Sequence, residues 1–164
     1  MRYLHTTRNC PDHWYPLDPK KRARVDEYLD WHHSNLRMGT GGRIFKKMVA
    51  PKLGIQTSDQ DLTLLVHQFK YSIKLINHWL SQHKYLCGDE ISIADLSAHS
   101  ELTQLGFLQN PDGNNDDSVS FDGYEKVKQW DETMKAIPEV EQVSKLIFDL
   151  IKLFHKKNKK SAKL

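Results

Sequence analysis

Hydrophobic and polar positions follow a helical period along almost the whole chain. Between Ser58 and Leu80, hydrophobic residues recur at three- and four-residue steps, which places them on one face of a helix. The positions are Leu62, Leu65, Val66, Phe69, Ile73, Ile76, Trp79 and Leu80. Alternation with period two, which marks a half-buried strand, is almost absent. The pattern therefore predicts an all-α protein.

Three of the predicted helices begin with capping residues. Asp18 stands directly before a proline at the first helical position. Ser58 with Asp61, and Ser92 with Asp95, have the spacing of a capping box. In a capping box, the serine hydroxyl accepts a hydrogen bond from the backbone N–H of the acidic residue, and the carboxylate accepts one from the backbone N–H of the serine. We expect the Ser92–Asp95 box to fix the start of a buried helix.

These signals predict five helices, over residues 19–48, 58–80, 93–107, 124–135 and 140–155. Glycines at 39, 41 and 42 indicate a bend or a close backbone approach within the first helix. The first two long helices should pack antiparallel, and the helix over 93–107, the most apolar, should lie in the centre. The last helix has a hydrophobic face formed by Val143, Leu146, Ile147, Leu150 and Phe154. Residues 110–123 should form a surface loop.

Two motifs resemble a known family. The segment YLCGDEISIADL, residues 85–96, resembles the start of the central helix in the C-terminal domain of glutathione transferases. In it, Ile91 and Leu96 are placed to form a hydrophobic staple around the capping box. Residues 12–18, DHWYPLD, and 22–33, RARVDEYLDWHH, resemble the theta class. The similarity extends over nearly the whole chain.

The resemblance implies an all-α bundle like the C-terminal domain of a glutathione transferase. Residues 1–17 would be the remnant of an interdomain helix and linker, 18–155 the helical domain and 156–164 a basic tail. The thioredoxin-like domain that holds glutathione in this family would precede residue 1 and is absent from the sequence. Paired with such a domain, the chain would conjugate the co-substrate glutathione to small electrophiles, or reduce organic hydroperoxides, as a homodimer. Alone it is expected to be inactive.

The same resemblance singles out three residues of the first long helix. Arg37 corresponds to an arginine that faces the cleft beneath the glutathione sulfur, where its charge would support a thiolate or a leaving anion. Ser34 corresponds to a polar residue that approaches glutathione in the other subunit, and Gly41 would leave room for substrate. A solvated arginine and a simple helix bend remain the alternatives. A second alternative concerns the whole chain, since the same domain also serves as a non-catalytic protein-interaction module.

Composition and charge argue against a membrane-spanning, a metal-binding and a nucleic-acid-binding protein. Charged residues make up 27% and hydrophobic residues 38% of the chain, as in a soluble globular protein, and no apolar run is long enough to cross a membrane. Nine histidines and two cysteines show no metal-binding spacing, so no metal site is expected. A net charge of +3 and a basic end without aromatic residues argue against nucleic-acid binding.

The chain ends in three residues that resemble a targeting signal. Ala162-Lys163-Leu164 resembles the peroxisomal Ser-Lys-Leu signal in its order of small, basic and leucine residues. The sequence therefore predicts a cytoplasmic or a peroxisomal protein.

Overall fold

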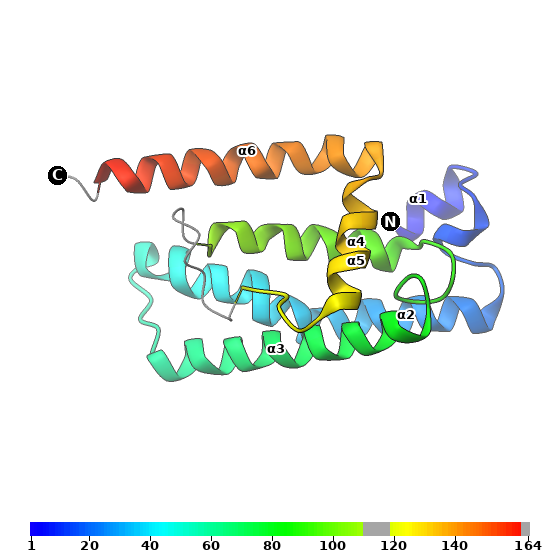
Figure 1. Cartoon of the computed structure of the whole chain (residues 1–164), viewed down its shortest axis with the longest axis horizontal. Coiled ribbons are helices and arrows are strands. Elements are labelled where there is room, and N and C mark those ends of the chain that lie inside the picture. Colours follow the sequence, from blue (N-terminus) through cyan, green and yellow to red (C-terminus); the bar gives the residue numbers. More distant parts are fainter. Residues whose placement is uncertain (110–118, 162–164) are drawn as a thin grey trace.

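A computed structural model of the chain shows a bundle of helices (Figure 1). The structure describes residues 1–109 and 119–161, with side chains described up to residue 157. The helices are α1 (Arg2–Thr7), α2 (Pro19–Ser34), α3 (Asp59–Gln82), α4 (Ile93–Thr103), α5 (Glu125–Lys135) and α6 (Pro138–Ser161). Short 3-10 and π-helical segments are η1 (Asp12–Trp14), η2 (Met38–Gly42), η3 (Phe45–Val49), η4 (Ala50–Leu53) and η5 (Gln104–Phe107). No strand occurs over these residues, which confirms the all-α prediction.

Local capping starts three of these helices, as the sequence predicts. The Asp18 carboxylate accepts the backbone N–H three residues later at 2.9 Å. Capping boxes form between Ser58 and Asp61 at the start of α3 and between Ser92 and Asp95 at the start of α4. Each box satisfies amides that the helix itself leaves unbonded.

Helix α4 lies in the centre of the bundle, as predicted. Figure 1 shows it between α6 above and α3 below, with α5 crossing the bundle in front. Its buried residues are Ile93, Ala94, Asp95, Ala98, His99, Glu101 and Leu102. The presence of three ionisable residues among them distinguishes α4 from an ordinary core helix, because buried charge requires partners.

The first long helix changes its hydrogen-bond pattern after Ser34. The sequence predicts one helix to residue 48, but α2 ends at Ser34, because Asn35, with φ −120° and ψ −87°, leaves the helical conformation. Beyond this break, η2 and η3 are π-helical turns and η4 is a 3-10 turn. The predicted close approach falls on Gly39, where an added Cβ would lie 2.6 Å from the backbone of Phe69 in α3. Gly54, in the left-handed conformation, ends the segment.

Gly39 and Gly42 therefore form a matched test of this contact. Gly39→Ala should destabilise the protein by about 1 to 3 kcal/mol, because two backbones would have to separate. At Gly42 the nearest atoms to an added Cβ are 3.5 Å away, so Gly42→Ala should be neutral or slightly stabilising. Urea denaturation measures both. Equal effects of the two substitutions would contradict the close approach.

Helix α6 is longer than predicted. It begins at Pro138 rather than 140 and continues to Ser161, so the segment starting at residue 156 is helical and not a separate tail up to that point. Proline suits the first helical position, and basic residues near a helix C-terminus interact favourably with the helix dipole. The Ala162–Leu164 signal lies outside the described residues.

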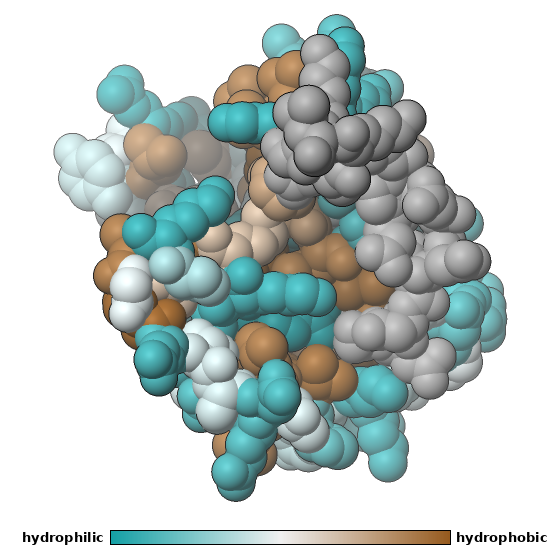
Figure 2. Space-filling model, turned by 90° about the vertical axis from the view of Figure 1, so that its left-hand side faces the viewer, coloured by the Kyte–Doolittle hydropathy of each residue, from teal (hydrophilic) through white to brown (hydrophobic). Residues whose placement is uncertain are grey.

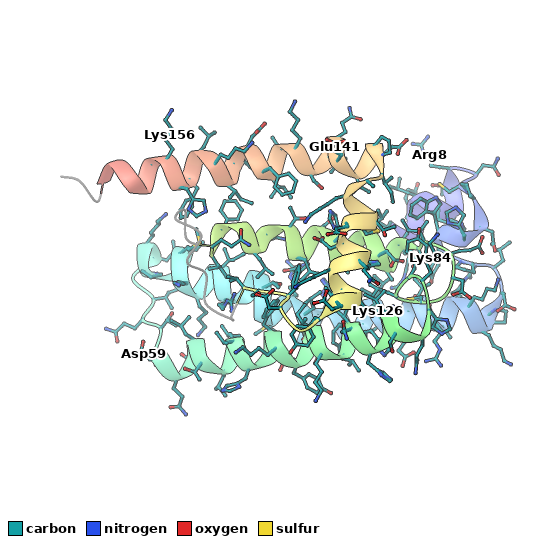
Figure 3. All side chains as sticks on the ribbon, in the orientation of Figure 1. Arg8, Asp59, Lys84, Lys126, Glu141 and Lys156 are labelled. Carbon is teal, nitrogen blue, oxygen red and sulfur yellow. The ribbon has the colours of Figure 1, made fainter. Side chains whose placement is uncertain are left out.

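The predicted hydrophobic face of α6 is split. Ile147 and Phe154 are half-buried against the bundle, whereas Val143, Leu146 and Leu150 are exposed. Leu153 is exposed too, and the four exposed residues follow one another at steps of three and four. Figure 3 shows Glu141 and Lys156 projecting from the outer edge of the helix, away from α4.

None of the described helices is long and apolar enough to span a membrane.

Candidate functional site

Arg37 lies at the junction between the α-helical and π-helical parts of the first long helix. It directly precedes η2, and its side chain is exposed. Among the described residues, no hydrogen bond or ion pair engages its guanidinium. Other arginines are held in place: Arg2 binds Asp26 at 2.5 Å and Arg24 binds Glu27 at 2.9 Å. The charge of Arg37 therefore remains available to a ligand.

Exposed hydrophobic side chains follow Arg37 along the same helix. Met38, Phe45 and Val49 are all exposed, as is Leu53 beyond them. Figure 2 looks at the end of the bundle where η3 and η4 lie, and shows hydrophobic surface in brown between hydrophilic side chains in teal. The exposed cation of Arg37 and these exposed apolar side chains thus belong to one stretch of the chain, a combination that suits a ligand with an apolar body and a polar reacting group.

Gly41 lies one turn beyond Arg37, near the aliphatic part of its side chain. The position of an added Cβ on Gly41 is 3.9 Å from Arg37 Cγ, and it is 2.8 Å from Oε1 of Glu101. The Gly41 N–H donates to the same oxygen at 3.0 Å. The space left by the absent side chain of Gly41 is therefore occupied by the Glu101 carboxylate.

Ser34 ends α2, one turn before Arg37, and is exposed. Its hydroxyl oxygen accepts a hydrogen bond from Asn35 Nδ2 at 3.1 Å. Asn35 also joins this turn to α3, because its Oδ1 accepts from Gln68 Nε2 at 2.9 Å. The three predicted site residues, Ser34, Arg37 and Gly41, thus lie on successive turns, with a break of the helix at Asn35 between Ser34 and Arg37.

Glu101 of α4 is a site residue that sequence reasoning missed. It is only 5% exposed, and its Oε1 accepts from Thr40 Oγ1 at 2.5 Å as well as from the Gly41 N–H. Its Oε2 lies 3.5 Å from Nε2 of His32. The available signal was a single carboxylate on the apolar face of the central helix, between Ala98 and Leu105.

The Glu101 carboxyl gives a prediction about pH. Burial raises its pKa, but the nearby His32 ring and the hydrogen bonds from Thr40 and Gly41 outweigh burial and leave the pKa below its ordinary value. A carboxyl with a lowered folded-state pKa stabilises the fold above its unfolded pKa of about 4.3, and this stabilisation is lost as pH falls through the folded pKa.

Glu101→Gln should therefore reduce the unfolding free energy by about 1 kcal/mol above pH 5, and by less as pH falls toward 3. Urea denaturation of both proteins at several pH values measures the difference. Glu141→Gln, at an exposed residue of α6, should show no such pH dependence. A difference that stays constant with pH would contradict this assignment.

The capping box of Ser92 and Asp95 lies at the opposite end of α4 from Glu101 and has a structural role. Asp95 is fully buried, and its carboxylate also accepts hydrogen bonds from Leu86 N–H and Trp130 Nε1–H, each at 3.0 Å.

Cys87 is not a reactive thiol, since burial raises its pKa to about 12. Within the described residues, no group of three potential metal ligands comes together.

A cavity of about 510 Å³ lies away from Arg37. It opens between α4, η5, α5 and α6. Two lysines line it, but Lys128 pairs with Asp122 at 2.9 Å and Lys135 pairs with Asp131. These pairs leave the cavity electrically balanced, and none of the predicted site residues lines it.

Comparisons with known proteins identify the family of this chain. The family model described as glutathione S-transferase, C-terminal domain, matches residues 44–138, more than half of the chain. The chain is 33% identical over 151 residues to glutathione S-transferase T1 of Arabidopsis thaliana, covering 89% of this chain and 60% of that protein. It is 41% identical over 106 residues to glutathione S-transferase theta-1 of Gallus gallus, covering 63% of this chain and 41% of that protein.

Solved structures show the same similarity. A human theta-class glutathione transferase, in complex with the glutathione conjugate of 1-menaphthyl sulfate, superposes with a TM-score of 0.77 at 27% identity. The superposition covers 96% of this chain and 63% of that one. The chain thus spans less than two thirds of the relatives that it matches. It belongs to the glutathione S-transferase family, and it corresponds to the C-terminal domain of theta-class members.

Proposed function

We propose that this chain is the electrophile-binding half of a theta-class-like glutathione transferase. A thioredoxin-like domain paired with it would bind the co-substrate glutathione. The thiolate sulfur would attack an electrophilic carbon, and the leaving group would depart with the bonding electrons; with an organic hydroperoxide, the same thiol would act as reductant. We further propose that the complete enzyme is a homodimer that acts on small electrophiles without a metal.

The observation that carries this proposal is the exposed guanidinium of Arg37, which is followed along the chain by the exposed side chains of Met38 and Phe45. A fixed positive charge lowers the pKa of a nearby thiol and stabilises the negative charge that develops on a leaving group. The apolar neighbours offer a surface for the body of the electrophile. Ser34, one turn before Arg37, would lie at the edge of this surface. The prediction that Gly41 leaves room for substrate is wrong, because the Glu101 carboxylate fills the space beside Gly41.

The exposed hydrophobic stripe of α6 supports the pairing with a second domain. Val143, Leu146, Leu150 and Leu153 form a continuous apolar row on the surface of this chain. Contiguous apolar rows of this kind mark surfaces that another protein unit covers. A domain that contacts both α6 and the Arg37 turn would enclose the site and exclude water from it.

The deciding experiment compares the lone chain with the same chain joined to a theta-type thioredoxin-like domain ahead of Met1. The lone chain should neither bind glutathione in calorimetry nor conjugate it. The joined protein should dimerise and show transferase or peroxidase activity toward a panel of electrophiles and hydroperoxides. A folded, dimeric joined protein without activity would favour the interaction-module alternative. Tight glutathione binding by the lone chain would contradict the assignment of roles.

We also propose that the protein is cytoplasmic or peroxisomal, on the basis of Ala162-Lys163-Leu164. A fluorescent protein that carries the last ten residues should collect in peroxisomes. Because the signal requires a free terminal carboxyl, one further residue added after Leu164 should disperse the fluorescence. Diffuse fluorescence of both proteins would exclude the peroxisomal reading and leave the cytoplasmic one.

A further inference from the structure

The π-helical turn η2 is an unusual conformation that requires support. A π turn holds one residue more than an α-helical turn and is rare outside single-turn bulges, which frequently occur at functional sites. In this chain, η2 begins at Met38, directly after Arg37. Conversion of η2 to an α-helical turn would rotate the residues after it by about 100° relative to Arg37. The turn therefore decides how the side chains that follow it are oriented relative to Arg37.

Glu101 supplies the support for this turn from another helix. Its Oε1 accepts two hydrogen bonds from adjacent residues of η2, the Thr40 hydroxyl at 2.5 Å and the Gly41 N–H at 3.0 Å. Thr40 Oγ1 is also 2.9 Å from the Leu36 carbonyl, but its single proton serves the shorter contact to the carboxylate. The contact is buried, so water competes little with it.

Gly41 transmits this contact to Arg37. The Glu101 carboxylate occupies the space where a side chain at residue 41 would lie, and the aliphatic part of Arg37 lies over the same glycine, with its Cγ 3.9 Å from that space. A displacement of Gly41 would therefore alter the surface on which the Arg37 side chain rests.

We propose that Glu101 is a positioning residue of the candidate site, because it holds η2 in the π-helical conformation and so fixes the placement of Arg37. The catalytic part of this inference rests on the proposed function. The geometric part does not, and it can be tested in the chain as it stands. Glu101 touches no reacting group, since its carboxylate is buried and fully directed at α2 and η2.

Two pairs of variants distinguish a local effect of Glu101 on η2 from a general contribution of Glu101 to the stability of the fold. Glu101→Leu removes the acceptor, whereas Glu101→Gln keeps an oxygen that can accept both hydrogen bonds. Thr40→Val removes one donor without changing the shape, whereas Thr40→Ser keeps the hydroxyl. The Thr40 pair provides a second route should Glu101→Leu fail to fold. Glu141→Gln, on the exposed edge of α6, is the control for loss of a carboxylate.

The measurements are amide hydrogen exchange and the NMR signal of Arg37 Nε. Glu101→Leu and Thr40→Val should accelerate exchange at residues 39–43 at least 10-fold more than in α5, and should shift the Arg37 Nε signal. In Glu101→Gln, Thr40→Ser and Glu141→Gln, the acceleration at 39–43 should stay within about 3-fold of that in α5, with the Arg37 signal little changed. A uniform acceleration over all helices, no acceleration at 39–43, or an unmoved Arg37 signal would overturn the proposal. Because these readouts need no activity, their failure is distinct from failure of the proposed function.

Discussion

Asp95→Ala is expected to destabilise the protein by about 3 to 5 kcal/mol, more than loss of a helix cap alone would cost. The Asp95 carboxylate accepts hydrogen bonds from the backbone N–H and the hydroxyl of Ser92, at 2.9 and 3.1 Å. It also accepts from Leu86 N–H and Trp130 Nε1–H. Alanine would leave these donors unpaired in a buried site, at about 1 to 3 kcal/mol for each group that water cannot reach.

Thermal and urea denaturation measure this loss, and the chain offers a matched control. Asp61 forms the same capping box at the start of α3, but its carboxylate lies at the surface, so Asp61→Ala should cost clearly less. Ser92→Ala removes only the cap and should cost about 1 kcal/mol, with an effect that does not add to that of Asp95→Ala. If Asp95→Ala and Asp61→Ala cost the same, the contacts to Leu86 and Trp130 contribute nothing.

Arg37→Ala should lower the turnover number of the joined, active protein by about 10- to 100-fold while changing its unfolding free energy by less than about 0.5 kcal/mol. The side chain is exposed and forms no ion pair within the described residues, so the fold does not depend on it. Its charge is expected to act on the thiolate and on the leaving group. The pH at which the rate reaches half its maximum should rise, because the thiol loses a nearby cation.

Arg24→Ala serves as the control for this experiment. Arg24 is an exposed arginine on α2, paired with Glu27 and distant in sequence from the site. Its replacement should leave turnover and the pH profile unchanged, whereas Arg37→Lys should retain part of the activity because it retains the charge. Equal losses for Arg24→Ala and Arg37→Ala, or no loss for Arg37→Ala, would reject a role of Arg37 in the reaction.

Local signals explain why the helices could be predicted. The caps at Asp18, Ser58 and Ser92 form because the side chain and the amide it binds are two or three residues apart. The hydrophobic spacing of α3 places its core residues on one face, since helical geometry brings every third and fourth residue together. Gly39, Gly41 and Gly42 likewise indicated an irregular turn.

The sequence by itself determined the all-α fold, the starts of α2, α3 and α4, the central place of α4 and the family. Only the tertiary structure decided which glycine allows the close approach to α3, that Asp95 also binds Trp130, and that Glu101 holds the turn beside Arg37. It also decided which side of α6 stays exposed. The physical reason is distance along the chain: Glu101 and Gly41 are 60 residues apart, and Asp95 and Trp130 are 35 apart. Periodicity and capping report only on neighbours within about one turn, whereas these contacts exist only once the helices have packed.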